Sequence, residues 1–411
     1  MADFGEILRS IGEFGLFQKV ILFALCFPNA ILPFQFASVF FIQSDPERHC
    51  NTDWILRADP DLSTGEQLNL TLPREEDGSF SRCRMFVPVD WNISDIREHR
   101  LNETTGCRDR WVYTNSLYEF DLVCDQANLL EVAQTVLMAG ILIGCLLFGP
   151  FAESFGRKRA AQVPVVVMVI FTATTGLCPN FYLYLASQFM VGIGYGGYRL
   201  NGVILATEWI GVSRRALGAC GTQLFGAVGQ IILASMIYFV RDWRLAQLLT
   251  AAPLAVVVVY IWFVPESARW LLDRGRTEEA KQLITKVAAI NKRPVSDSLL
   301  EKVRFTYTKQ NASTCFLCLT DPCFFLRFSL NITYYCLSFN VGNFGLNIFL
   351  TQAMFGLTEL PAHILCIWLL EALGRQVSIM STLLIGGLLC LLILAVPQEL
   401  PDSTDEAEAN R

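Results

Sequence analysis

Long apolar runs separated by polar turns dominate the pattern of this chain. Eight or nine runs approach the roughly 20 residues that a helix needs to cross about 30 Å of hydrocarbon. They cover residues 20–42, 128–150, 161–178, 182–206, 216–240, 245–264, 325–345, 348–370 and 378–397. Because the apolar residues come in continuous runs rather than at amphipathic spacing, the pattern predicts an all-α polytopic membrane protein.

The polar segments between these runs predict the topology. We expect a cytoplasmic N-terminus at 1–19, and we interpret 20–42 as a signal anchor rather than a cleavable signal peptide. Helices 2–6 at 128–264 would complete the N-terminal half, and 265–324 would be a cytoplasmic linker that contains a short amphipathic helix. Helices 7–9 at 325–397 then precede an acidic tail at 398–411.

The hydrophilic segment 43–127 combines glycosylation sequons with cysteines. The sequons begin at Asn69, Asn92 and Asn102, and the cysteines are Cys50, Cys83, Cys107 and Cys124. An even cysteine count beside clustered sequons is typical of an oxidising, extracytoplasmic compartment. We therefore predict an extracellular loop that carries glycan and two disulfides, for which three connectivities are possible.

Composition excludes most other functions. The chain is 53% hydrophobic and only 17% charged, and its net charge of −6 comes partly from the loop and the tail. It has three histidines, and neither a nucleophile elbow nor a phosphate loop is found. Cys315, Cys318 and Cys323 lack a second ligand pair at zinc-site spacing. We expect no enzyme activity, no cofactor, no metal and no nucleic-acid partner.

Two turns share one motif. The first is Gly149-Pro-Phe-Ala-Glu153-Ser-Phe-Gly156-Arg157-Lys158-Arg159, where Gly149 and Gly156 would let the backbone bend. A partial echo, Glu371-Ala-Leu-Gly374-Arg375, again lies between two apolar runs. Cations in such short turns indicate the cytoplasmic side. An acidic residue, two intervening positions and Gly-Arg at matching turns indicate a protein built from repeated halves.

The first motif resembles the loop signature of the major facilitator superfamily. Thr207-Glu208-Trp209 and Pro265-Glu266-Ser267-Ala268-Arg269-Trp270-Leu271-Leu272 narrow the resemblance to solute carrier family 22, the organic anion, cation and zwitterion transporters. The loop sequences Cys50-Asn-Thr-Asp-Trp-Ile-Leu and Glu66-Gln-Leu-Asn-Leu-Thr resemble two members of that family in particular. The similarity covers the chain from about residue 4 to about residue 397.

The resemblance implies the major facilitator fold, with about nine of its usual twelve helices present. It also implies an alternating-access carrier in the plasma membrane that exchanges a small organic ion for a counter-ion. The expectation from the missing helices is a chain truncated after helix 9. An alternative is therefore an isoform that does not transport and acts only by associating with other membrane proteins. The sequence leaves the oligomeric state open.

Polar side chains within the spans are candidates for a substrate path, because they are costly in hydrocarbon. Asn29 stands between Pro28 and Pro33, which predicts either a bent helix beside a cavity or a packing kink with Asn29 bonded to a neighbouring helix. Arg199 could receive a substrate carboxylate bidentately, or it could snorkel to the interface or pair with a structural acid.

The resemblance adds further candidates. It places Tyr334, Tyr335 and Gln230 at positions that line the family's substrate cavity, although Tyr334 and Tyr335 also fit an aromatic packing stripe. Glu359 and His363 share a helix face, so His363 would either contact the ligand or bond to Glu359. Arg199 and protonated His363 favour an organic anion such as nicotinate, urate or another carboxylate, whereas Glu359 leaves a cation or zwitterion open.

Overall fold

The computed structural model describes 4–36, 48–75, 78–108, 110–113, 123–124, 128–211, 214–240, 242–293, 331–332, 334 and 348–395. Several sequence-based expectations lie outside these residues. They are most of the helix expected at 325–345 including Tyr335, most of the second half of the linker, Cys315, Cys318 and Cys323, and the tail at 398–411.

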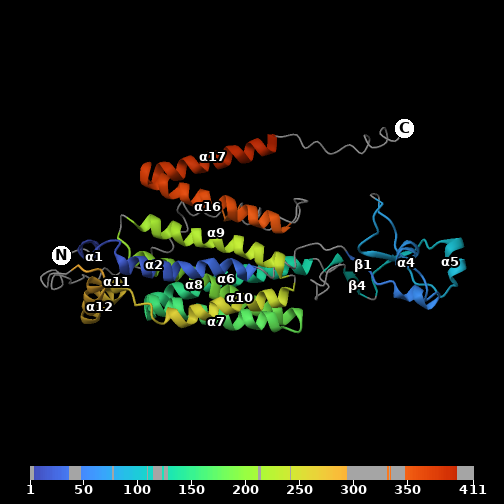
Figure 1. Cartoon of the computed structure of the whole chain (residues 1–411), viewed down its shortest axis with the longest axis horizontal. Helices are drawn as coiled ribbons and strands as arrows, with labels where there is room; N and C mark the ends of the chain where they lie inside the picture. The colour runs from blue at the N-terminus through green and yellow to red at the C-terminus, as the bar shows by residue number, and fades with distance from the viewer. Residues whose placement is uncertain are drawn as a thin grey trace.

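A bundle of long helices forms the body of the protein (Figure 1). These helices are α2 (Leu16–Ile31), α6 (Asn128–Phe155), α7 (Arg157–Leu177), α8 (Phe181–Glu208), α9 (Arg215–Phe239) and α10 (Trp243–Ile261). On the α9 side lie α16 (Ile348–Ala372) and α17 (Arg375–Ala395). Eight of the nine expected spans thus contain a described helix, and six stretches within the described residues are long and apolar enough to cross a membrane.

The turn between α6 and α7 differs from the expectation. Helix α6 continues through Gly149 and Pro150 to Phe155, so the expectation that the backbone bends at Gly149 is wrong. The chain reverses at Gly156, whose φ of +106° lies in the left-handed region that favours glycine. Gly374 has the same property, with φ of +79°, immediately before α17. The two motif turns therefore both contain a glycine with a positive φ.

Glycines bring α6 and α8 into backbone contact. A Cβ added at Gly140 would lie 2.3 Å from the carbonyl oxygen of Phe189, and one at Gly192 would lie 2.4 Å from that of Leu137. Such close approach is typical of small residues at membrane helix interfaces. The glycine run of α8 therefore serves helix packing, as its position within an apolar run indicates.

Pro28 interrupts the backbone hydrogen bonds of α2, because proline has no N–H to donate to the carbonyl of Ala24. The hydroxyl of Tyr260 in α10 donates to that carbonyl at 2.9 Å. The next carbonyl, Leu25, accepts from the hydroxyl of Tyr198 in α8 at 3.0 Å. Two neighbouring helices thus supply donors at the proline, and these hydrogen bonds join α2 to both.

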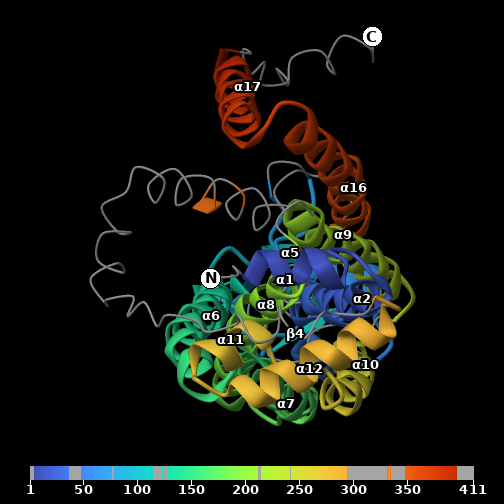
Figure 2. The ribbon, with the colours of Figure 1, turned by 90° about the vertical axis from the view of Figure 1, so that its left-hand side faces the viewer.

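Short helices close one end of the bundle (Figure 2). They are α1 (Phe4–Ile11), α11 (Ala268–Asp273) and α12 (Thr277–Ile290), and the buried Ile7, Leu8 and Ile11 join the core of the bundle. Asn291 connects them to the first long helix: its amide nitrogen donates to Ile11 O at 2.9 Å, and its amide oxygen accepts from Phe17 N at 3.0 Å.

A small disulfide-bonded unit lies at the other end (Figure 1). It contains β1 (Arg48–Cys50), η2 (Asp53–Arg57), α4 (Thr64–Thr71), β2 (Arg84–Phe86), α5 (Ile93–His99), β3 (Thr104–Gly106) and β4 (Trp111–Tyr113). Strands β1 and β4 pair antiparallel, as do β2 and β3. The structure joins Cys50 to Cys107 and Cys83 to Cys124, which is one of the three connectivities that the count allows.

Candidate functional site

A cavity of about 450 Å³ opens among α2, α8, α9 and α16. It is lined by Asn29, Leu32, Pro33, Tyr195, Arg199, Thr222, Gln223, Gly226, Ala227, Gln230, Leu233, Asn331, Tyr334, Glu359, Ala362 and His363. Six of the seven residues expected to bind substrate line this one cavity, and the seventh, Tyr335, lies outside the described residues. The volume falls in the range of small-molecule sites.

Neutral groups orient Arg199 on one wall. Its Nη1 donates to the hydroxyl of Tyr195 at 2.9 Å, and its Nη2 donates to Oε1 of Gln223 at 3.3 Å. The guanidinium carbon also lies 5.9 Å from the ring centroid of Tyr195. These contacts fix the direction of the side chain.

The α16 wall carries groups of mixed character. Glu359 and His363 stand four residues apart, and both are half-buried. Tyr334 donates its hydroxyl to Oε1 of Glu359 at 3.0 Å, while no hydrogen bond joins Glu359 to His363. The described residues therefore do not show the alternative in which a neutral His363 bonds to Glu359. Glu359 instead ties Tyr334 to α16.

Asn29 forms a contact that neither sequence-based alternative anticipates. Its amide nitrogen donates to Leu25 O at 2.9 Å, one turn back in its own helix. Its side chain is nevertheless on the cavity wall and is 7% exposed. The hydrogen bonds to neighbouring helices come from Tyr198 and Tyr260 instead.

Sequence reasoning missed four polar lining residues: Tyr195, Thr222, Gln223 and Asn331. Spacing could have found three of them. Tyr195 precedes Arg199 by four residues, Gln223 precedes Gln230 by seven, and Asn331 precedes Tyr335 by four, so each shares a helix face with a residue that was singled out. Thr222 lies at none of these spacings from such a residue.

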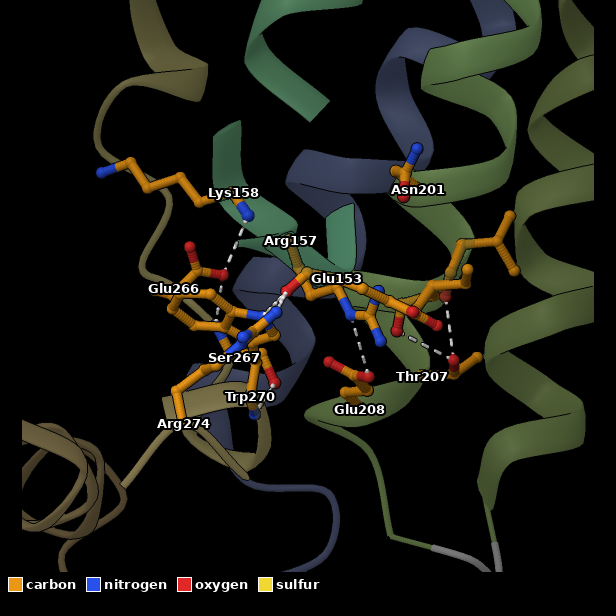
Figure 3. A network of polar contacts seen from close by, with 12 residues as sticks. Glu153, Arg157, Lys158, Asn201, Thr207, Glu208, Glu266, Ser267, Trp270 and Arg274 are labelled. Carbon is orange, nitrogen blue, oxygen red and sulfur yellow. Dashed lines mark hydrogen bonds and ion pairs between the residues drawn. The ribbon is translucent and has the colours of Figure 1, made fainter. Parts of the chain in front are cut away.

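The first loop motif docks on α11 at the closed end of the bundle (Figure 3). Oε1 of Glu266 accepts from the backbone N–H of Lys158 and from that of Ser267, each at 2.9 Å. The indole Nε1 of Trp270 donates to the carbonyl of Glu153 at 2.9 Å, and Arg274 donates to the same carbonyl. Glu153 thus contributes its backbone to this network.

Two ion pairs accompany the motif turns. Arg157 lies 3.4 Å from Glu208, and both side chains are largely buried, so the pair joins the start of α7 to the end of α8. At the second turn Glu371 lies 3.2 Å from Arg214, and both side chains are half exposed. The acid of the echo motif therefore contacts the N-terminal half of the chain.

Comparison with known proteins defines the class to which this fold and cavity belong. The sugar (and other) transporter family model matches residues 97–405. A solved structure of the xylose transporter XylE from E. coli, in a partially occluded inward-open conformation, superposes with a TM-score of 0.51 over 87% of this chain and 74% of that one. XylE bound to 6-bromo-6-deoxy-D-glucose gives 0.54 over 87% and 71%. Both are 14% identical, so they establish the fold, that of a major facilitator transporter.

Two human relatives define the family more narrowly. The chain is 38% identical to solute carrier family 22 member 13, over 98% of this chain and 75% of the relative. It is 33% identical to member 14, over 96% and 69%. The chain belongs to solute carrier family 22. It is a multi-pass membrane transporter of organic ions and not an enzyme. The family membership confirms the resemblance drawn from the sequence motifs.

Proposed function

We propose that this protein carries small organic anions, carboxylates of the nicotinate or urate kind, by alternating-access exchange against a counter-ion. The observation that carries the proposal is the position of Arg199 on the cavity wall, held by the neutral side chains of Tyr195 and Gln223. A guanidinium presented in this way matches the two oxygens of a carboxylate. Tyr195 and Tyr334 also line the cavity, where they would pack against the ring of such a substrate.

The other charges of the cavity set the selectivity. Glu359 would repel an anion, and the hydroxyl of Tyr334 spreads part of that carboxylate's charge by donating to it. His363 lines the same cavity from α16.

A zwitterion or a cation is the second candidate, and Glu359 favours it. Glu359 and Arg199 line the same cavity from α16 and α8, so a ligand with both charges would meet a partner for each. Uptake of a radiolabelled anion, competed in turn by unlabelled anions, cations and zwitterions, separates these candidates.

The decisive variants are Arg199→Lys and Glu359→Gln. A bidentate charge contact is worth about 1.5–3 kcal/mol, so Arg199→Lys should raise the KM for nicotinate roughly ten- to a hundredfold at unchanged surface expression. Glu359→Gln should leave or lower that KM for an anion and raise it for a cation. The matched control is Arg269→Lys, an exposed arginine of α11 that does not line the cavity. Unchanged kinetics in Arg199→Lys, with normal expression, would overturn the proposal.

We also propose a plasma-membrane location with a cytoplasmic N-terminus. The cations of the turn at Arg157, Lys158 and Arg159 support this orientation, since the turn contacts the segment before α11, which lies at the end of the bundle opposite the disulfide-bonded unit. An N-terminal epitope tag should bind antibody only after the cells are permeabilised, whereas a tag in the 43–127 segment should bind on intact cells. The reverse pattern would contradict this topology.

A further inference from the structure

A second cavity, of about 660 Å³, lies at the closed end of the bundle, between the first turn of α7 and helices α11 and α12. It is rich in charge: Lys158, Arg159, Arg276 and Lys286 line it together with Glu266 and Glu279. It is separate from the cavity that contains Arg199, with which it shares no lining residue.

The carboxylates do not neutralise this cluster. Glu279 is already paired with Arg276 through contacts of 2.7 and 2.5 Å. Glu266 directs Oε1 at two backbone N–H groups, and the Lys158 ammonium donates to the neutral carbonyl of Trp262 at 2.8 Å. Three cations thus face one unpaired carboxylate, which leaves the cavity positive.

Two of these cations have unused hydrogen-bonding capacity. Among the residues that the structure describes, the side chains of Arg159 and Lys286 form no hydrogen bond or ion pair, and both are exposed. They come from different elements, the first turn of α7 and the middle of α12, and they line the same cavity. A ligand with several acceptor oxygens would bridge them.

Exposed aromatic side chains border the cavity. Phe155, which lines it, is 52% exposed. Trp262, whose carbonyl binds Lys158, is 53% exposed, and the adjacent Phe263 is 83% exposed. Aromatic residues exposed at the ends of spanning helices are typical of the level of the lipid headgroups. The cavity therefore opens at the membrane interface.

We propose that this cavity binds the phosphate-bearing headgroup of an anionic phospholipid, in the leaflet on the side of α1 and α12. Basic pockets between membrane helices are suited to such headgroups. The phosphate oxygens would accept from Arg159 and Lys286, with Lys158 beside them, and the acyl chains would lie along Phe155 and Trp262. A soluble phosphate offers the same oxygens but gains nothing from the exposed aromatic rim.

The test titrates the 411-residue chain, purified in detergent micelles, with phosphatidylserine and separately with phosphatidylcholine, and counts bound lipids by native mass spectrometry. A cation near an anionic headgroup is worth about 1 kcal/mol, which is about fivefold in affinity. Arg159→Gln combined with Lys286→Gln should therefore weaken phosphatidylserine binding about thirtyfold and leave phosphatidylcholine unchanged. The matched control, Arg269→Gln with Lys281→Gln, removes the same charges from α11 and α12 outside the cavity and should bind as the parent does.

The single variant Lys286→Gln covers the case in which the double variant does not fold, because this exposed side chain has no described partner to lose. It should weaken phosphatidylserine binding about fivefold. Equal affinity in the parent and in either folded variant would overturn the proposal, as would an equal loss in the control pair. Inorganic phosphate is added as a competitor: no displacement of phosphatidylserine supports the lipid, and displacement at comparable concentration would overturn the lipid in favour of a soluble phosphate.

Discussion

The hydrogen bond from Tyr260 to Ala24 yields a prediction that can be tested as a double-mutant cycle. The Ala24 carbonyl lacks an intrahelical donor because Pro28 stands where the N–H would be, and the Tyr260 hydroxyl replaces it at 2.9 Å. Tyr260→Phe removes that donor and leaves the carbonyl unpaired within the bundle. We expect the free energy of unfolding to fall by about 1 kcal/mol, between the mean measured for intramembrane hydrogen bonds and the cost of an orphaned buried acceptor.

The cycle depends on Pro28→Ala, which restores a backbone N–H to the Ala24 carbonyl. In that background Tyr260→Phe should cost almost nothing, so the coupling free energy should be about 1 kcal/mol. Tyr198→Phe is the matched control. Its acceptor, the Leu25 carbonyl, has a second donor in the amide of Asn29, so Tyr198→Phe should combine additively with Pro28→Ala.

The assay is reversible unfolding of the purified protein in mixed micelles, by titration with dodecyl sulfate and with helicity as the signal. Only the coupling term is compared, so any separate effect of straightening α2 cancels. Additive costs for Tyr260→Phe and Pro28→Ala would refute the reasoning, since the tyrosine would then not substitute for the missing backbone donor. Equal coupling for Tyr198 and Tyr260 would also contradict it.

Further predictions concern packing, pH and modification. Gly192→Ala places a Cβ 2.4 Å from the Leu137 carbonyl and should lower the melting temperature, by overpacking of about 1–3 kcal/mol, whereas Gly386→Ala in α17, with nothing within 4 Å of its Cβ, should not. Burial lowers the pKa of His49 from 6.5, so the folded state favours the neutral form of this side chain. This contribution is present above pH 6.5 and is lost as the pH falls toward the lowered folded value. The rate at which a phosphine reduces Cys50–Cys107, divided by the rate in His49→Asn at the same pH, should therefore rise below pH 6.5. Asn69, Asn92 and Asn102 are all exposed, so glycosidase should shift the gel mobility of the protein; a shift that persists after triple Asn→Gln substitution would contradict glycosylation of this segment.

The helices were predictable because long apolar runs identify segments that can span a membrane. The predicted helix begins at residue 161, whereas α7 begins at Arg157, about one turn earlier. Three cations at its N-terminal end hide this beginning in the hydropathy pattern, and Gly156 directly precedes it. The predicted bend at Gly149 was wrong because glycine and proline both disfavour a helix interior, yet α6 continues through Gly149 and Pro150.

The candidate site was predictable to the extent that polar residues in apolar runs are costly. Arg199 and Glu359 are conspicuous for that reason, Gln230 came from the family resemblance, and the cavity contains all three. The partner of Arg199 within its own helix, Tyr195, could be found from spacing, whereas the partners of Glu359 and Glu266 could not. The partner of Glu359 is Tyr334 rather than its helical neighbour His363, and the carboxylate of Glu266 caps a helix that begins more than a hundred residues earlier. Such contacts depend on helix packing, which leaves no periodic trace in the sequence.

The clamp that Asn291 places on the start of α2 has a consequence for the order of assembly during synthesis. The two ends of this contact, Phe17 and Asn291, are separated by 274 positions along the chain. The first long helix therefore enters the membrane well before the residue that fastens its N-terminal end has been translated. Until the ribosome has released Asn291, α1 can find neither this amide nor the apolar face of α12. The packing of the N-terminal half is therefore completed late in synthesis, when Asn291 binds the backbone at Phe17.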